Sequence, residues 1–259
     1  MNDVVLIREM LEAAGRIAMQ HFLKVRPTWK ANQTYVTEAD IAVQAFMKQV
    51  LGTHFPEDGI IAEEENLRQE PASGNRYWII DPIDGTASFV AGLPVWGIGL
   101  SLVEEGRPVA GYFWVPTSED FYYTTPDGVV YRNDQPTEIK TPGPLHRESL
   151  MLTFSRLHRR YTLASSYPGK VRGLGSTIAH MCYVATGSAD VALLGRVCIW
   201  DLAVGLALLT NNGGVLRYLH GSAVSLTDLF SGAPAPSLMI CGHADAVARY
   251  EALITRFAS

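Results

Sequence analysis

Two carboxylates and a hydroxyl group fall close together in the stretch Trp78-Ile79-Ile80-Asp81-Pro82-Ile83-Asp84-Gly85-Thr86. The apolar residues before Asp81 predict the end of a buried strand. Pro82 favours extended backbone at the residue before it and removes one hydrogen bond from the strand. Asp84, Gly85 and Thr86 are then expected on a turn where a helix begins. Carboxylate oxygens beside unpaired backbone N–H groups can bind Mg²⁺ ions and a phosphate together.

Further carboxylates are expected on turns elsewhere in the chain, at Asp40, at Glu63 and Glu64, and at Asp201. Local roles explain each one singly, because Asp is common in turns and in the first turn of a helix. Asp201, for example, opens an apolar helix and would serve as its N-cap. These local roles account for the position of each residue but not for the whole set.

The elements that must position these residues begin with helices. Apolar residues at helical spacing predict an amphipathic helix over residues 4–22 and a second helix after Thr37, its expected N-cap. A short strand over 59–62 would lead into Glu63–Glu65, whose side chains would alternate between faces, with Glu65 in solvent. Residues 67–76 are predicted as a loop. Four β-rich runs indicate an antiparallel meander: 95–103, 108–115, 121–124 and 129–132.

A domain boundary is predicted at Thr141-Pro142-Gly143-Pro144. Residues 1–142 would form an N-terminal α+β domain with the antiparallel sheet and most metal ligands. Residues 143–259 would form an α/β domain with Asp201 and the pocket for the leaving group. In this second part strands are expected over 149–154, 190–194, 215–219 and 237–241, and helices over 177–186, 202–210 and 246–257.

The composition excludes several classes of protein. A net charge of −5 offers no electrostatic footprint for nucleic acid. The sequence has no uninterrupted run of about 18 apolar residues, so no membrane span is expected. The cysteines Cys182, Cys198 and Cys241 form no CxxC pair, which argues against a zinc site or a disulfide framework. The first ten residues lack the pattern of a signal peptide, so a cytoplasmic protein is expected.

The chain resembles the inositol monophosphatase family of Mg²⁺-dependent, lithium-sensitive phosphatases. The stretch 78–86 carries the likeness, together with four further motifs in the order and spacing of the family: Val36-Thr37-Glu38-Ala39-Asp40, Ile61-Ala62-Glu63-Glu64, Gly175-Ser176 with Ala185-Thr186-Gly187-Ser188-Ala189-Asp190, and Trp200-Asp201-Leu202-Ala203 with Gly213-Gly214. The resemblance implies the family's layered αβαβα sandwich, of mixed α/β (α+β) class and shared with fructose-1,6-bisphosphatases. It also implies a homodimer.

The resemblance further implies a set of metal and phosphate ligands. A first Mg²⁺ would be held by Glu63, Asp81 and the Ile83 carbonyl, a second by Asp81, Asp84 and Asp201, and a third, weaker one by Asp40 and Glu63. Thr86, helped by Glu63, would orient the attacking water. Clustered carboxylates repel one another, and several cations offset that repulsion. Two or three Mg²⁺ ions per subunit are therefore expected.

The phosphate and the leaving group have their own expected contacts. The N–H groups of Gly85 and Thr86 would receive phosphate oxygens. By resemblance Ser176 places a hydroxyl near the phosphate, and a role as helix N-cap fits it equally well. Thr177 would lie near the leaving group. Leu194 stands where inositol-specific members carry a glutamate that binds ring hydroxyls, and leucine cannot accept those hydrogen bonds.

The expected activity is hydrolysis of a small phosphomonoester by attack of metal-activated water, without a covalent intermediate. Inositol 1-monophosphate is the default substrate. Ser88-Phe89 with Gly92, Pro94, Trp96 and Gly97 is also similar to the histidinol-phosphatase branch. Fructose 1,6-bisphosphate and 3′-phosphonucleotides are further alternatives. A non-catalytic binding or regulatory protein of the same fold is the rival of another class.

Overall fold

The computed structural model describes residues 3–24, 27–29, 35–159 and 161–256. Its helices are α1 (Asp3–His21), α2 (Glu38–His54), α3 (Thr86–Val90), α4 (Thr177–Ala185), α5 (Ile199–Asn211) and α6 (Ala244–Glu251), with short 3₁₀ turns η1 (Glu64–Asn66), η2 (Leu157–Arg159) and η3 (Leu226–Leu229). Its strands are β1 (Thr28–Trp29), β2 (Tyr35–Val36), β3 (Gly59–Ala62), β4 (Leu67–Gln69), β5 (Arg76–Asp84), β6 (Gly97–Glu104), β7 (Arg107–Val115), β8 (Asp120–Thr124), β9 (Val130–Arg132), β10 (Gln135–Pro136), β11 (Leu150–Thr153), β12 (Tyr161–Leu163), β13 (Lys170–Arg172), β14 (Val191–Leu194), β15 (Gly214–Tyr218), β16 (Met239–His243) and β17 (Ile254–Arg256).

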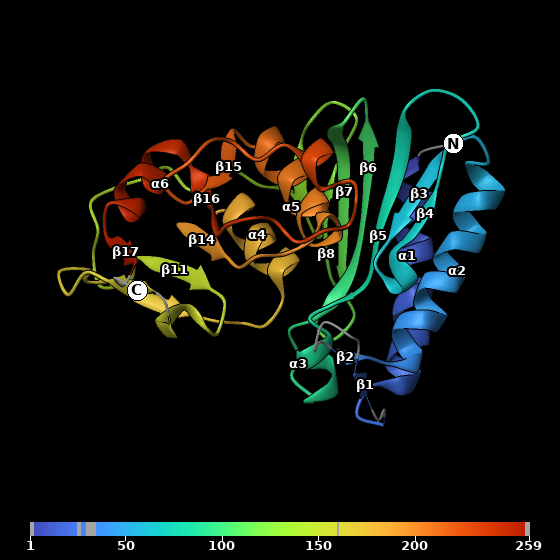
Figure 1. Cartoon of the computed structure of the whole chain (residues 1–259), viewed down its shortest axis with the longest axis horizontal. Helices are drawn as coiled ribbons and strands as arrows, with labels where there is room; N and C mark the ends of the chain where they lie inside the picture. Colours follow the sequence, from blue (N-terminus) through green and yellow to red (C-terminus); the bar gives the residue numbers. More distant parts are fainter. Residues whose placement is uncertain (1–2, 25–26, 30–34, 160, 257–259) are drawn as a thin grey trace.

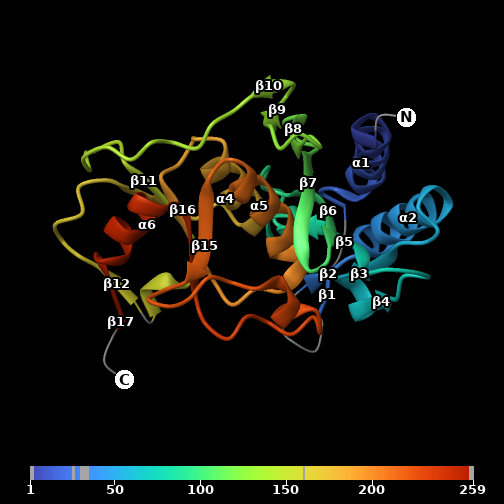
Figure 2. The ribbon, with the colours of Figure 1, turned by 90° about the horizontal axis from the view of Figure 1, so that it is seen from above.

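Five layers follow one another across the molecule. From right to left, Figure 1 shows the pair α1 and α2, the large sheet, the pair α4 and α5, a smaller sheet, and α6. The view from above keeps the same order (Figure 2). Each layer buries an apolar face against the next, which is the general condition for a stable layered domain. The predicted αβαβα sandwich is confirmed.

The first sheet is the predicted meander, extended at one edge. Its strand order is β10-β9-β8-β7-β6-β5-β3-β4, with β3 and β5 parallel and the other neighbours antiparallel. The prediction of a loop over 67–76 is wrong in part, because residues 67–69 pair with β3 as the edge strand β4. That edge strand is exposed and polar, so its residues lack the alternation that marks a half-buried strand.

Strand β5 continues further than the sequence indicates. It runs through Pro82 to Asp84, whereas the apolar run before Asp81 predicts its end near Asp81. Its pairing with β6 shifts register between Asp81, opposite Gly99, and Asp84, opposite Gly97. Pro82 lies within this irregular stretch, as its missing N–H requires. The backbone therefore stays extended while the regular pairing is interrupted.

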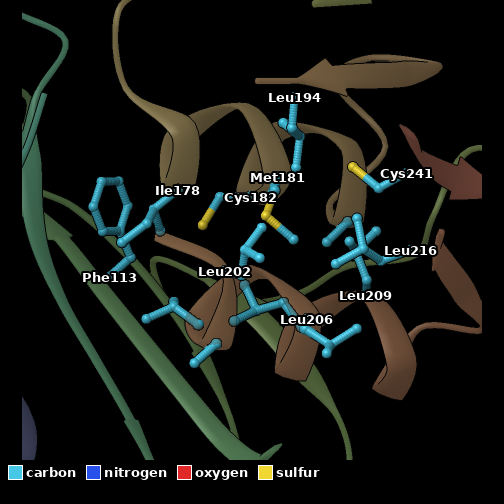
Figure 3. Packing of buried hydrophobic residues seen from close by; sticks show 14 of the residues in the cluster. Phe113, Ile178, Met181, Cys182, Leu194, Leu202, Leu206, Leu209, Leu216 and Cys241 are labelled. Atoms are coloured by element: carbon cyan, nitrogen blue, oxygen red, sulfur yellow. The ribbon is translucent and has the colours of Figure 1, made fainter. Parts of the chain in front are cut away.

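Helices α4 and α5 are apolar on nearly every face because both of their sides are covered. They lie between the two sheets, within the largest hydrophobic cluster. In Figure 3, Phe113 of β7 lies on one side of this layer, and Leu194 and Cys241 of the smaller sheet lie on the other. The cluster joins residues from both sides of the predicted boundary at residue 142, and the division into two domains stays a prediction.

The smaller sheet has the strand order β13-β11-β14-β16-β15. Its outer face is covered by α6, which ends at Glu251 and not at Phe257 as predicted. The chain after α6 forms β17, which pairs with β12, so long-range pairing overrides helix formation there. Residue 257 lies outside the described residues. Among the described helices, none is long and apolar enough to cross a lipid bilayer.

Candidate metal and phosphate site

Three aspartates from two layers meet at one point. Asp81 and Asp84 lie on β5, and Asp201 lies in the first turn of α5. One carboxylate oxygen from each lies within 4.8 Å of the others. They border a cavity of about 640 Å³, lined by Trp29, Tyr35, Glu63, Asp81, Ile83, Asp84, Gly85, Thr86, Ala87, Phe154, Ser155, Arg156, Gly175, Thr177 and Asp201.

The irregular end of β5 explains why two aspartates three residues apart share one site. On a regular strand, residues i and i+3 project from opposite faces. The register shift between Asp81 and Asp84 removes that alternation, as β-bulges do beside many functional sites. The spacing in the sequence is therefore compatible with a shared metal only because the strand is irregular at Pro82.

Asp84 also binds the N-terminus of α4. Its Oδ2 accepts hydrogen bonds from the Ser176 hydroxyl and from the Ile178 N–H at 2.7 Å, and its Oδ1 accepts one from the Thr177 N–H at 3.1 Å. Ser176 is the N-cap of α4, since its Oγ accepts a hydrogen bond from the Ala179 N–H at 3.0 Å. The alternative role proposed for Ser176, helix capping, is thus confirmed. Its side chain is buried and does not line the cavity.

Asp201 lies at the third position of α5 and is not its N-cap. The N-cap is Cys198, whose N–H donates to Oδ2 of Asp201 at 2.8 Å. The N-cap role expected for Asp201 is therefore wrong by three residues. A carboxylate at the third helical position commonly reaches back to the N-cap N–H in this way. This hydrogen bond fixes the orientation of the carboxylate that faces Asp81 and Asp84.

Asp40 and Thr86 connect the first helical layer to the site. As predicted, Thr37 caps α2, and its N–H and hydroxyl donate to Oδ2 of Asp40 at 2.8 and 2.6 Å. The Thr86 hydroxyl lies 3.4 Å from Oδ1 of Asp40 and 3.1 Å from the carbonyl oxygen of Ile83. Gly85 turns the chain at φ +90°, and a Cβ there would lie 3.0 Å from the backbone of Gly175. The turn therefore requires glycine.

The three glutamates after β3 do not continue its extended geometry. Residues 64–66 form the 3₁₀ turn η1, so the expected alternation of faces is wrong. The half-buried Glu63 lines the cavity, and Glu65 is exposed, as predicted. The peptide groups of Glu64 are held by Gln44, at 2.9 and 3.0 Å. The turn places the side chains of Glu63 and Glu65 in different environments.

Burial and mutual repulsion raise the pKa of each aspartate in the group. Burial is the largest cause for Asp81, followed by the charges of Glu63 and Asp84. Burial raises the pKa of Asp84 to about 6, although the hydrogen bond from Ser176 acts in the opposite direction. Burial also raises the pKa of Asp201.

A divalent cation fits this donor set. Oδ1 of Asp81 is buried and has no hydrogen-bond partner among the described residues. An ionised oxygen in that position is costly unless a cation binds it. Hard carboxylate oxygens without histidine or thiolate ligands match Mg²⁺ better than zinc or copper.

The two residues predicted to contact the leaving group lie in different places. Thr177 lines the cavity, whereas Leu194 is buried in the hydrophobic cluster and is absent from the lining. The contribution of Leu194 to substrate binding stays a prediction. Trp29 and Tyr35 also line the cavity, with ring centroids 4.4 Å apart, and neither is among the site residues predicted from the sequence. No spacing or motif marks them, because only the pairing of β1 with β2 brings them to the site.

The metal-free protein is expected to lose stability as the pH rises from about 4 to about 6. Folding raises the pKa of Asp84 from 3.8 to about 6, so in this window the folded state holds a proton that the unfolded chain has released. Protons compete with metal for the ionised carboxylates. Mg²⁺ should therefore raise the melting temperature more at about pH 7.5 than at about pH 5. Scanning calorimetry with chelator and with Mg²⁺ measures this difference.

His180 adds a second pH-dependent contribution to stability, which the experiment must separate from that of Asp84. Burial lowers the pKa of its imidazole to about 4, so its effect on stability has the opposite sign and is the same with and without Mg²⁺. Comparing the two samples at each pH cancels it, and NaCl at matched ionic strength controls for screening. A shift in melting temperature that does not depend on pH would contradict the prediction.

Comparison with known proteins relates this geometry to one family. Residues 4–252 match the inositol monophosphatase family. The chain is 30% identical to a histidinol-phosphatase of Chlorobaculum parvum over 82% of its length and 84% of the relative. It is 29% identical to a fructose-1,6-bisphosphatase/inositol-1-monophosphatase of Thermotoga maritima, over 86% and 88%. The solved structure of a Thermotoga maritima IMPase is similar with a TM-score of 0.81 and 26% identity, over 97% of both chains.

Proposed function

Because the chain belongs to the inositol monophosphatase family, and is therefore a phosphoric monoester hydrolase, we propose that it uses Mg²⁺ at the acidic cavity to hydrolyse a small phosphomonoester. The meeting of Asp81, Asp84 and Asp201 carries this proposal. Two of these carboxylates are buried and the third is partly buried, and like charges so close together repel one another unless a cation lies between them. A cation between them gives the arrangement its use.

The proposed metal ligands are those that the family resemblance implies. Glu63, Asp81 and the Ile83 carbonyl would hold one Mg²⁺, and Asp84 and Asp201 would join Asp81 around a second. A third ion would lie between Glu63 and Asp40. Bound Mg²⁺ supplies Lewis-acid stabilisation of phosphoryl oxygens and lowers the pKa of water. Support comes from the buried, unpartnered oxygen of Asp81 and from the raised pKa values of the aspartates.

Residues of the chain itself would orient the reactants. The Thr86 hydroxyl, held between Asp40 and Ile83, would fix the attacking water together with Glu63. The N–H groups of Gly85 and Thr86 would bind phosphate oxygens, because both residues line the cavity at the start of α3. Thr177 would contact the leaving group. Water attacks phosphorus, the P–O bond to the leaving group breaks, and the leaving oxygen takes up a proton.

Inositol 1-monophosphate is the default substrate of this proposal. Histidinol phosphate, fructose 1,6-bisphosphate and a 3′-phosphonucleotide are the alternatives, and similar proteins carry names of all these kinds. A homodimer is also proposed, by family resemblance, and so is a cytoplasmic location. No disulfide joins the buried thiols of Cys182 and Cys241, which is compatible with a reducing compartment.

A panel of phosphomonoesters tests the proposal. The purified protein is expected to release phosphate from at least one member with Mg²⁺ and from none after chelation, because the buried carboxylates need a cation for the reaction. Phosphate release is measured colorimetrically across inositol, histidinol, sugar and nucleotide phosphates. Restoring Mg²⁺ to the chelated sample controls for damage. If no substrate releases phosphate with Mg²⁺, the non-catalytic alternative replaces the enzyme.

A further inference from the structure

Gln44 lies on α2 one helical turn after Asp40, so both side chains leave the same face of that helix. The Gln44 side chain is buried, and it contacts the first residue of η1. Its Oε1 accepts a hydrogen bond from the Glu64 N–H at 2.9 Å, and its Nε2 donates one to the Glu64 carbonyl at 3.0 Å. A single side chain therefore holds both polar backbone groups of one residue.

This two-bond contact, called here the Gln44 clamp, requires a particular kind of side chain. It needs a donor and an acceptor side by side, which the amide groups of asparagine and glutamine offer without a charge. It also needs the reach of glutamine, because asparagine is one methylene group shorter. Since Gln44 and Asp40 belong to the same helix, the clamp ties the chain after β3 to the helix that carries Asp40.

The clamp acts directly beside Glu63. The N–H of Glu64 belongs to the planar peptide group that follows the Cα of Glu63. On the other side, the N–H of Glu63 donates to the Ile80 carbonyl of β5 at 3.3 Å. The backbone around Glu63 is thus held from α2 and from β5. Because the Glu63 side chain lines the acidic cavity, these contacts determine where its carboxylate enters the site.

The turn after Glu63 has a costly backbone conformation. Glu65 and Asn66 have φ values of +61° and +48°, and neither residue is glycine. Left-handed backbone at such residues persists only where the surrounding structure holds it, and it is concentrated at functional sites. A turn released from the clamp can relax toward ordinary backbone values and carry Glu63 with it. The contact that holds this turn is therefore a candidate for a functional role.

Glu63 and Asp40 act on the same part of the site from separate segments of the chain. Burial raises the pKa of Asp81, and the charges of Glu63 and Asp40 raise it further. The carboxylate of Asp40 is oriented by Thr37, whose N–H and hydroxyl both donate to its Oδ2. Groups that orient metal ligands in this way tune the affinity for the metal. The Gln44 clamp gives Glu63 a corresponding support through the backbone.

We propose that Gln44 is a positioning residue of the metal site, which sets Glu63 relative to Asp40 and so determines the affinity for the cations that Glu63 would bind. This inference rests on the proposed function, in which Glu63 and Asp40 are metal ligands. Gln44 is not itself a ligand and acts only through the backbone of Glu64. A purely structural role, satisfying a buried peptide group, would change stability and leave the metal affinity of the folded protein unaltered.

Gln44→Met tests the proposal, because it removes both hydrogen bonds and keeps an unbranched side chain. The Mg²⁺ concentration for half-maximal turnover is expected to rise roughly 10- to 100-fold, the usual effect of losing a group that orients a metal ligand. At saturating Mg²⁺ kcat should return to within about threefold of the wild-type value, since every ligand is still present. Calorimetric titration with Mg²⁺ in the absence of substrate should show the same weakening.

Hydrogen–deuterium exchange adds a readout that does not involve turnover. In the metal-free wild-type protein the backbone N–H groups of residues 63 and 64 should exchange slowly, because Ile80 and Gln44 hold them. In metal-free Gln44→Met the exchange over residues 63–66 should be roughly tenfold faster, as the loss of a buried hydrogen bond implies. Adding Mg²⁺ should slow exchange much more in the variant than in the wild-type protein.

Two further variants of α2 are the controls. Gln49→Met makes the same replacement at an exposed position and should leave Mg²⁺ dependence and exchange unchanged. Leu51→Ala removes a buried side chain away from the clamp, so it should lower the melting temperature without changing Mg²⁺ dependence. If circular dichroism shows that Gln44→Met is unfolded, Gln44→Asn takes its place. Its amide is too short to form the clamp, and the expected changes have the same direction.

Several outcomes separate this inference from the proposed function. If the folded Gln44 variant binds Mg²⁺ with wild-type affinity, or loses kcat by the same factor at every Mg²⁺ concentration, the positioning role is overturned and the phosphatase stands. The same follows if Leu51→Ala weakens Mg²⁺ binding equally, because lost stability is then the cause. If the wild-type protein hydrolyses no ester, the proposed function fails, and the Mg²⁺ titrations still test the clamp. A wild-type protein that binds no Mg²⁺ overturns both.

Discussion

The Asp84→Asn variant is expected to lose Mg²⁺-dependent turnover by roughly 10³-fold or more. Metal ions supply several kcal/mol of transition-state stabilisation, and each 1.36 kcal/mol corresponds to a tenfold change in rate. Asp84 is buried and lies within 4.8 Å of Asp81 and Asp201. An amide of the same shape removes the negative charge that a cation requires. Steady-state kinetics on the best substrate of the panel measure the loss. A Mg²⁺ titration followed by melting temperature should show weaker binding.

Two control variants separate the effect of losing the Asp84 charge from the effect of disturbing the fold. Ser176→Ala removes the hydroxyl that donates to Asp84 and caps α4 but keeps the carboxylate, so its effect on kcat/KM should be much smaller. Glu65→Gln removes an exposed carboxylate close to Glu63 in the sequence and should leave turnover unchanged. If Asp84→Asn keeps turnover within tenfold of the wild-type value, the metal role of Asp84 is wrong. The circular dichroism spectrum shows whether Asp84→Asn is folded. If it is not, Asp201→Asn is the variant to test in its place.

Thr86→Val is expected to lower kcat by about 10²- to 10⁴-fold, the range that positioned proton-transfer groups contribute. Valine keeps the shape of threonine and removes the hydroxyl that lies between Asp40 and the Ile83 carbonyl. In the proposed function the backbone N–H of residue 86 binds the phosphate, and valine retains this N–H, so KM should change little. Steady-state kinetics resolve kcat from KM.

Thr86→Ser is the conservative partner of that variant. It restores the hydroxyl without the methyl group and should recover most of kcat. The effect of Mg²⁺ on melting temperature should be alike in wild type, Thr86→Val and Thr86→Ser. If Thr86→Val weakens Mg²⁺ binding in proportion to its loss of kcat, the hydroxyl acts on the metal site and not on the attacking water.

The two variants test different parts of one arrangement. Asp84 joins the end of β5 to the N-terminus of α4, and Thr86 joins the start of α3 to Asp40 of α2. Four separate elements therefore meet within one short stretch of chain. Small displacements of any of them would misplace a carboxylate or the hydroxyl, which explains why the site lies between well-packed layers.

Much of the site could be predicted from the sequence because its signals are local. The run 78–86 contains a buried strand, a proline, two carboxylates and a glycine turn, and each has a short-range physical meaning. The capping of α2 by Thr37 with Asp40 is likewise local and agrees with the structure. Helices α4 and α5 were expected close to their observed bounds, since they are long apolar runs bounded by polar residues and glycine.

Only the tertiary structure decided which side chains share a cavity. The 3₁₀ turn at Glu64, the register shift beside Pro82 and the strand β17 all depend on pairing with distant segments, which no local pattern reports. The aromatic pair Trp29 and Tyr35 came to the site in the same way. The sequence by itself thus determined the chemistry at the phosphorus atom, because that chemistry is encoded within short motifs. The surroundings of the leaving group depend on long-range contacts, and those the fold alone supplied.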